Sequence, residues 1–269
     1  MNEAASVGAD NTGMSETKHS GLGTRAPSPA VAFLLDAHRA ATRPPGMPPT
    51  LAPSDVAQAL RIQAELVDAL GEPVAGWKVS LTGEPMRAPI LRSRLHTSPV
   101  ELPSNGLAPF GIEAEIAFRF ERSLPPREEA YSFAEFVESV VALPAIEVVS
   151  SRFADYGAAP PLERLCDLMS NGGLVVGEPV VDWAALDFAR LPVRLMRNGG
   201  IVLEREGGHP QSDPCGWGLA LVNALRRGMG VPEGLVVTTG SFTGIVFGAP
   251  GEAYRAEFAG FAPVSLQFS

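Results

Sequence analysis

Three glutamates in two predicted strands are the side chains of this sequence best placed to do chemistry. Glu113 and Glu115 stand two residues apart in residues 111–120, where apolar side chains occupy every second position. That alternation predicts a half-buried strand, so both carboxylates would lie on one face of it. Glu147 is the single acid of the apolar stretch 143–150, which predicts a buried strand.

Carboxylates placed in this way need a compensating charge or proton. An isolated buried carboxylate costs several kcal/mol, so Glu147 requires a cation, a proton or an edge position. Three carboxylates facing one pocket would suit a hard divalent ion such as Mg²⁺. The spacing also allows a simpler interpretation, in which Glu113 and Glu115 form the solvent-facing side of an ordinary strand.

Further candidate residues lie in segments with open interpretations. Lys78 stands between apolar residues of the predicted strand 76–82, either as a positioned cation or proton donor or as an outward-facing lysine. His209 lies in a polar loop, where a single histidine is more often structural than catalytic. His96 belongs to a Pro-rich connection that is either a lid or plain surface. Residues 238–244 offer hydroxyls and glycines after a strand.

Composition narrows the class of protein. The chain has 269 residues, of which 45% are hydrophobic, and this is enough for a sizeable core. A net charge of −9 disfavours nucleic acid as a partner. Cys166 and Cys215 lack metal-ligand spacing and predict a reducing cytoplasm rather than a disulfide scaffold. No apolar stretch is long enough to span a membrane, and residues 1–25 lack the apolar segment of a secretory signal.

The elements that must position these residues predict an α+β fold. Capping residues and apolar periodicity predict helices over 31–42, 54–70, 132–142 and 213–227, with Ser54 as an N-cap and a Ser132–Glu135 capping box. A hairpin turn is expected at Asn198-Gly199, and closing strands at 235–239 and 264–268. We expect three sections: a disordered tail (1–25), a helical N-terminal section (26–75) and a β-rich catalytic domain (76–269).

Six segments carry a family resemblance when they are taken together. They are GWKVSLT (76–82), IEAEIAF (112–118), PAIEVVSSRF (144–153), CDLMSNGGLVVG (166–177), GHP (208–210) and TGSFTG (239–244). In this order they resemble the 2-keto-4-pentenoate hydratase family, which belongs to the fumarylacetoacetate hydrolase superfamily. The resemblance runs from about residue 52 to residue 268. Each segment is weak by itself, and the ordered set is specific.

The resemblance implies a fold, a cofactor and an assembly state. The fold would be the mixed β-sheet roll of the superfamily, with a helical section before it. Mg²⁺ or Mn²⁺ would be bound by Glu113, Glu115 and Glu147, and the protein would be a homo-oligomer. The partner would be a small 2-oxo or 2-hydroxydienoic acid, with no role for nucleic acid or membrane.

The resemblance also implies roles for three other side chains. Lys78 would point into the site as a catalytic cation near the substrate oxygen. Ser170 and Ser241 match positions that line the substrate pocket in the family.

The chain departs from the family pattern near the substrate. The hydratases usually have a Pro-Asp-Tyr/Phe-Gly loop after the first segment, with an acid that takes part in proton transfer, but residues 87–96 contain no acid. One hypothesis is that His96 replaces this acid as a catalytic residue. Another is that Arg92 or Arg94 binds a second substrate carboxylate, as a decarboxylase of a dicarboxylic oxo acid would need.

The leading prediction is a metal-dependent hydratase, a hydro-lyase of aromatic-type catabolism. It would add water to a 2-hydroxy-2,4-dienoate and give a 4-hydroxy-2-oxo acid, with the metal stabilising enolate charge. The same scaffold suits a 4-oxalocrotonate-like decarboxylase or an acylpyruvate-like C–C hydrolase, which their products distinguish. A further alternative is a binding or assembly partner that has kept the metal site and lost turnover.

Overall fold

The computed structural model describes residues 26–40, 42–80 and 86–269. Its helices are α1 (Pro29–Arg39), α2 (Val56–Leu70), α3 (Phe133–Val137), α4 (Pro161–Cys166) and α5 (Cys215–Leu225). Its strands are β1 (Val74–Ser80), β2 (Met86–Leu91), β3 (Leu95–Thr97), β4 (Val100–Leu102), β5 (Gly111–Phe120), β6 (Val140–Val149), β7 (Asn171–Val176), β8 (Pro192–Arg197), β9 (Gly200–Glu206), β10 (Val236–Ser241), β11 (Val246–Phe247), β12 (Ala253–Phe258) and β13 (Val264–Phe268). Residues 1–25, predicted as a disordered tail, lie outside the described residues.

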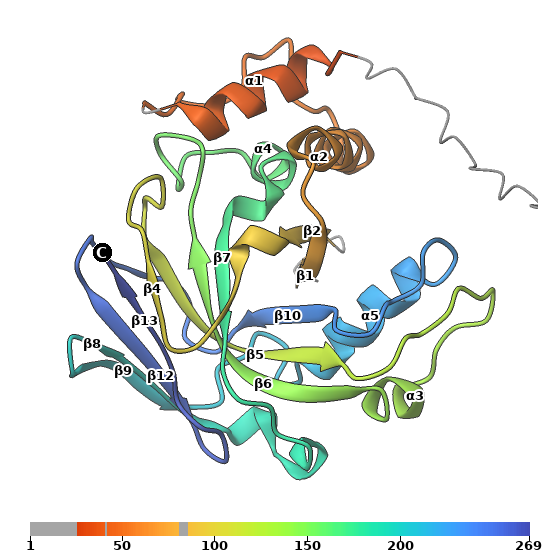
Figure 1. Cartoon of the computed structure of the whole chain (residues 1–269), viewed down its shortest axis with the longest axis vertical. Coiled ribbons are helices and arrows are strands. Elements are labelled where there is room, and N and C mark those ends of the chain that lie inside the picture. The colour runs from red at the N-terminus through yellow and green to blue at the C-terminus, as the bar shows by residue number, and fades with distance from the viewer. Residues whose placement is uncertain (1–25, 41, 81–85) are drawn as a thin grey trace, which may run out of the picture.

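The strands form two sheets. The larger has the order β2-β1-β10-β5-β6-β7-β3, with β11 also paired to β5, and the smaller has the order β4-β13-β12-β8-β9. Three neighbouring pairs are parallel (β1 with β10, β3 with β7, β4 with β13), and the other pairs are antiparallel. Figure 1 shows α1, α2 and α4 gathered at one end of the molecule, above β2 and β7, and α5 beside β10. The α+β mixed-sheet fold is therefore confirmed.

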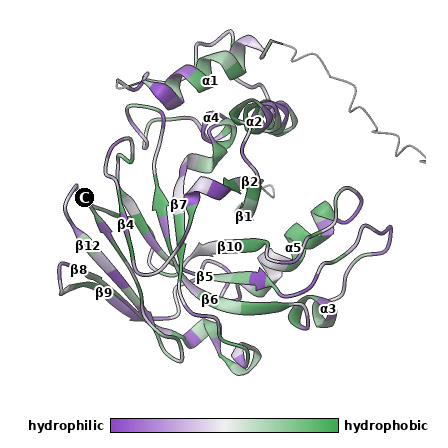
Figure 2. Cartoon of the chain, viewed as in Figure 1, coloured by the Kyte–Doolittle hydropathy of each residue, from purple (hydrophilic) through white to green (hydrophobic). Residues whose placement is uncertain are grey.

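The long central pair β5–β6 is the frame of the larger sheet. The two strands pair antiparallel without a break from Gly111–Val149 to Phe120–Val140. One face of this pair packs into the main apolar core, where Phe118 contacts Phe136 and Trp183 with ring centroids 5.4 and 5.1 Å apart. Figure 2 shows β6 and β7 as largely hydrophobic along their lengths. Strands covered on both faces carry near-continuous apolar runs, which explains why residues 140–149 are so rich in Val, Ile and Leu.

The N-terminal helices form a second apolar cluster with α4. The Asp55 side chain accepts a hydrogen bond from the backbone N–H of Gln58 and caps α2, so the N-cap is one residue later than the predicted Ser54. At its other end Gly71 adopts a left-handed conformation (φ 69°), which glycine accepts readily at the end of a helix. Gln63 Nε2 donates to the Leu165 carbonyl at 2.7 Å and joins α2 to α4.

Two expectations about local elements need correction. The capping box of Ser132 and Glu135 is present, but α3 ends at Val137 and not near residue 142, because residues from Val140 onward pair with β5. Residues 87–94 are not a lid, since most of them form β2 and a short 3-10 turn alongside β1. The Asn198-Gly199 hairpin turn is confirmed between β8 and β9. In the described part of the chain, no helix has the length and apolarity needed to cross a membrane.

Two glycines in α5 give a matched test of its packing. A Cβ atom at Gly218 would lie 2.6 Å from Phe136 Cζ in the core, whereas at Gly216 it would meet nothing within 4 Å. Gly218→Ala should lower the free energy of unfolding by about 1–3 kcal/mol through overpacking. Gly216→Ala should be neutral or stabilise by up to about 1 kcal/mol, because alanine favours helix. Urea unfolding measures both changes, and equal effects would contradict this packing.

Candidate metal centre

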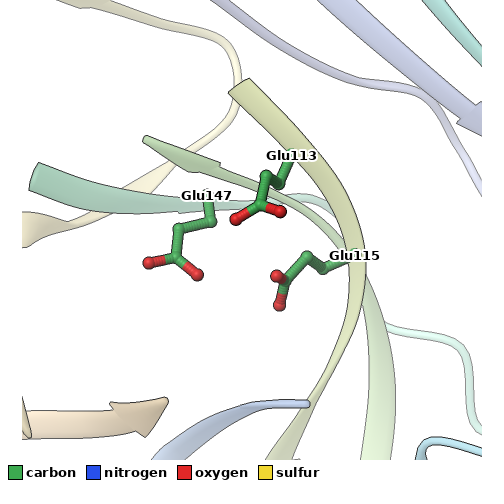
Figure 3. A group of neighbouring side chains, drawn as sticks. All are labelled: Glu113, Glu115 and Glu147. Carbon is green, nitrogen blue, oxygen red and sulfur yellow. The ribbon is translucent and has the colours of Figure 1, made fainter. Parts of the chain in front are cut away.

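Three carboxylates converge on one point between the central strands. Glu113 and Glu115 project from β5 and Glu147 from β6, where Glu113 and Glu147 are direct cross-strand partners. Each offers an oxygen, and these three oxygens lie within 4.8 Å of one another. Figure 3 shows the side chains pointing to a common centre. The same-face prediction for Glu113 and Glu115 is confirmed, because residues two apart on a strand share a face.

Burial makes the charged form of this cluster costly. Glu115 and Glu147 are each 2% exposed, which excludes the interpretation of a solvent-facing strand side. Burial, reinforced by the neighbouring charge of Glu147, raises the pKa of Glu113 to about 7. The same causes, with the charge of Glu113 added, raise the pKa of Glu115 well above its ordinary value. A cluster of this kind needs a positive charge to remain ionised.

Strand β10 supplies polar partners to the cluster. The Thr238 hydroxyl donates a hydrogen bond to Glu115, and the backbone N–H of Gly240 lies 3.3 Å from the same oxygen. Ser241 borders the pocket, and its hydroxyl helps to hold the pKa of Glu113 down. These contacts follow from the antiparallel pairing of β10 with β5, in which Ser241 lies opposite Glu115.

Lys78 is the cation that approaches the cluster. Its ammonium group forms a buried ion pair with Glu147 and donates to the Met169 carbonyl at 3.0 Å. Burial alone would lower the pKa of Lys78, but the carboxylates of the cluster outweigh it and raise this pKa above its ordinary value. Lys78 is therefore charged at neutral pH and not an outward-facing surface lysine.

The donor set fits a hard divalent cation. Three carboxylates, of which Glu115 and Glu147 are buried and Glu113 is half-buried, share one ion pair to an ammonium group among the described residues, so the cluster lacks positive charge. Oxygen donors are the ligands that Mg²⁺ and Mn²⁺ prefer. Nearby, Asn171 Nδ2 lies 3.4 Å from Glu147, and its Oδ1 is buried without a hydrogen-bond partner in the described chain. The Asn171 Oδ1 atom is thus free to accept a hydrogen bond from water or a ligand beside the cluster.

The Met169 carbonyl, which accepts a hydrogen bond from Lys78, belongs to a strained turn. Residues 168–170 all have positive φ values (51°, 51° and 55°), a region that L-residues rarely adopt in succession. The Arg152 guanidinium spans the turn, because it donates to the Asp167 carbonyl at 2.9 Å and to the Asn171 carbonyl at 3.0 Å. Arg94 also donates to the Asn171 carbonyl, at 2.6 Å. We call Arg152, Arg94 and Asp167 the turn clamp.

Helix α1 reaches the turn clamp through His38. Arg94 Nη2 lies 3.3 Å from His38 Nδ1, and His38 Nε2 lies 3.4 Å from the Asp167 carboxylate. Because a guanidinium can only donate, Nδ1 must accept and the ring proton sits on Nε2, toward Asp167. Burial alone would raise the pKa of Asp167, but Arg152 and His38 hold it below its ordinary value.

The structure brings together five of the seven predicted site residues. Lys78, Glu113, Glu115, Glu147 and Ser241 line one cavity of about 370 Å³. The roles of these side chains remain predictions, since placement alone does not assign them.

Ser170 is not among the residues that line this cavity. It is 1% exposed, at the end of the strained turn, and its hydroxyl has no hydrogen-bond partner among the described residues. Met169, the preceding residue, lines the cavity.

The structure does not bring His96 to the carboxylates. His96 pairs with Val175, and Val175 pairs with Ile146, so these three side chains share one face of the sheet. Glu147 is the next residue after Ile146 and points to the other face. The hypothesis that His96 replaces the missing acid therefore has no support in this geometry.

The predicted second-carboxylate arginines are also misplaced. Arg94 belongs to the turn clamp, and Arg92 is an exposed residue of the 3-10 turn after β2. Neither lines the cavity that contains the carboxylates.

Sequence reasoning missed several residues that line this cavity. Trp217 on α5 and Arg205 on β9 come from elements that are distant in the sequence from the glutamates. The Gly208-His209-Pro210 segment lies between these two residues in the sequence and also borders the cavity, so it could have pointed to both. His209 donates from Nε2 to the Thr239 carbonyl at 2.7 Å and accepts at Nδ1 from Gln211, so it supports the β10 backbone as a structural histidine.

Known proteins are similar to this chain in sequence and in fold. It is 28% identical over 222 residues to the 2-hydroxyhexa-2,4-dienoate hydratase of Comamonas testosteroni, covering 76% of this chain and 81% of that protein. It is 29% identical over 166 residues to a 4-oxalocrotonate decarboxylase of Pseudomonas sp. (strain CF600), covering 58% and 59% of the two chains. No protein-family model matches the chain.

Solved structures show the same fold. The 4-oxalocrotonate decarboxylase of Pseudomonas putida G7, complexed with magnesium and adipate, superimposes with a TM-score of 0.73 and 22% identity, covering 89% of this chain and 97% of that one. The mixed-sheet roll and its carboxylate pocket define a metal-dependent enzyme. The chain is thus similar in sequence to a dienoate hydratase and to 4-oxalocrotonate decarboxylases, and it has the fold of the latter.

The buried His38 predicts a pH dependence of stability. Burial, with the charges of Arg152 and Arg94, lowers the pKa of His38 below 6.5 despite the opposing effect of Asp167. The folded state therefore binds fewer protons than the unfolded state, so His38's contribution is present in full above pH 6.5 and is lost as the pH falls toward the folded-state value.

His38→Gln should narrow the difference in unfolding free energy between about pH 7.5 and about pH 5.5, because the amide does not titrate there. Urea unfolding of both proteins at the two pH values checks this. An unchanged difference would show that His38 does not titrate in this way.

Proposed function

We propose that this protein is a hydratase that adds water to a 2-hydroxy-2,4-dienoate and releases a 4-hydroxy-2-oxo acid. Glu113, Glu115 and Glu147 would hold Mg²⁺ or Mn²⁺. The observation that carries the proposal is the buried carboxylate cluster paired with Lys78 in one cavity. Support comes from the hydratase of C. testosteroni, which matches three quarters of the chain.

The chain's own residues prepare the pocket for an oxo acid. When bound, the cation would supply a Lewis acid that lowers the cost of negative charge on the substrate's 2-oxygen. Lys78, held between Glu147 and the Met169 carbonyl, adds a fixed positive charge on the same side. The carboxylates therefore attract cations, and the ammonium favours the anionic form of the substrate over its neutral form.

Hydration also requires proton transfers, and the chain holds groups for them. The dienol must lose its hydroxyl proton and gain one at carbon before water adds to the resulting enone. Lys78 is charged at neutral pH, so it would donate the proton that is gained at carbon and then take up the one lost from the hydroxyl group. Thr238 and Gly240 help to fix the orientation of Glu115 by donating to it.

A decarboxylase is the second candidate function. A 4-oxalocrotonate decarboxylase is 29% identical to 58% of this chain, and another shares the fold with a TM-score of 0.73. Both reactions proceed through enolate charge on a 2-oxo acid, so the carboxylate cluster by itself does not separate them. Their products do, since one gains a water and the other loses CO₂.

The proposal extends to the cellular setting. Cys166 and Cys215 are both buried free thiols, which fits a reducing cytoplasm. A homo-oligomer is supported by the family resemblance.

The first experiment is a turnover assay with freshly generated 2-hydroxypenta-2,4-dienoate. The hydratase should show loss of the ultraviolet absorbance of the diene that depends on Mg²⁺, with a product one water heavier by mass spectrometry. Release of CO₂ from a dicarboxylic oxo acid, without water addition to the dienoate, would favour the decarboxylase instead.

Glu147→Gln tests the ligand set. The amide keeps the size of the side chain but removes one anionic donor and the partner of Lys78. We expect turnover to fall by about 100-fold or more even in excess Mg²⁺, the upper range for losses at metal sites. Calorimetry should show weakened Mg²⁺ binding. The exposed Glu101→Gln serves as control and should keep wild-type values; wild-type rates in Glu147→Gln would refute the assignment.

A further inference from the structure

Arg205 is the arginine of the candidate active-site cavity in the described part of the chain. It lies near the end of β9, in the smaller sheet, whereas the three glutamates and Lys78 project from the larger sheet. The cavity therefore has two cationic side chains that enter from different sheets. Lys78 is already paired with Glu147.

The guanidinium of Arg205 is held in a defined position although the residue is exposed. Its Nε donates to the Phe242 carbonyl at 2.8 Å. Gly208, with φ 107°, makes room for it, because a Cβ there would lie 2.6 Å from Nε and 2.8 Å from the guanidinium carbon. With Nε engaged, both terminal nitrogens remain to bind one carboxylate side by side.

Arg205 has no carboxylate partner among the described residues. Glu204, its neighbour on β9, is instead paired with Arg194 of β8. Some surface arginines of this chain have such partners, as Arg194 and Arg255 do with Glu257, but these do not line the cavity. An oriented cation without an anion, in a cavity with three acids, is suited to receive an anion from a ligand.

We propose that Arg205 binds a second carboxylate of the substrate, at the end remote from the 2-oxygen. The substrate class is then a dicarboxylic 2-hydroxydienoate or 2-oxo acid. This inference rests on the proposed function, in which the 2-oxo acid end of the substrate lies at the cation that the glutamates would hold. Trp217, buried and bordering the same cavity, supplies an apolar wall for the chain between the two ends.

The position of Arg205 explains why a dianion would enter an acidic cavity. A second carboxylate would be repelled by the cluster of Glu113, Glu115 and Glu147 if it met no compensating charge. Arg205 is a specificity-determining residue in this view, since a substrate ending in a methyl group leaves its guanidinium unused.

Binding of two matched probes tests the inference without turnover. 2-Oxoadipate and 2-oxohexanoate have the same six-carbon chain and differ in a terminal carboxylate or methyl group. Calorimetry with the full chain and Mg²⁺ should show that the wild type binds 2-oxoadipate about tenfold or more tightly, the effect of one charge-assisted contact.

Arg205→Met should remove this preference and leave the affinity for 2-oxohexanoate within about twofold. Arg205→Lys should keep part of the preference, because it keeps the charge and loses the fork. Arg61→Met, at an exposed arginine of α2 away from the cavity, should behave as wild type. Unchanged Mg²⁺ affinity in Arg205→Met would show that the cavity remains folded.

Each contrary result has a distinct meaning. Equal wild-type affinities, equal loss of both probes in Arg205→Met, or no binding of either probe would overturn the role of Arg205. If the preference and its loss are observed but no dienoate is hydrated, the proposed function fails and the inference about Arg205 stands. If dienoate is hydrated but 2-oxoadipate is not preferred, the proposed function stands and the inference about Arg205 fails.

Discussion

The cost of burying three carboxylates together governs the functional part of this molecule. Glu113, Glu115 and Glu147 offer oxygens within 4.8 Å of one another, and among the described residues only Lys78 forms an ion pair with one of them. Like charges at this distance in a buried place cannot all stay ionised without added positive charge. The site is therefore suited to bind a divalent cation. Either protons or a metal ion can offset the repulsion between the carboxylates, so the two compete for the site.

The fold meets this demand with rigid elements. β5 and β6 are the long central strands of the larger sheet, so the glutamates are fixed by an unbroken ladder of backbone hydrogen bonds. Lys78 reaches them across β10, and its second partner is a carbonyl in a strained turn that Arg152 spans. The strain is sustained because a buried guanidinium joins both ends of the turn. His38 extends the support to helix α1.

In our proposal the two sheets contribute different groups: the larger supplies the metal ligands and Lys78, and the smaller supplies the residue that selects the substrate. The larger sheet supplies the carboxylates and the ammonium, to which our proposal assigns the oxo-acid end of the substrate. The smaller sheet contributes Arg205, whose guanidinium enters the same cavity from β9. A scaffold arranged in this way can change its substrate by altering side chains of the smaller sheet and its neighbouring loop, while the metal centre stays as it is.

The sequence by itself determined what depends on local pattern. Period-two alternation and an isolated acid located Glu113, Glu115 and Glu147, capping residues located α2 and α3, and Asn198-Gly199 located the hairpin. Ordered motifs indicated the family, because they combine many weak local signals. These features are set by neighbouring residues, so they can be read along the chain.

Only the tertiary structure decided which side chains meet. The pairing register turned His96 to the opposite face of the sheet, since a shift of one residue reverses a strand's side chains. It also placed Arg94 in the turn clamp and Arg205 in the cavity, although both are arginines in unremarkable surroundings of the sequence. Distances between segments far apart in the chain depend on sheet order and packing, and no local pattern encodes them.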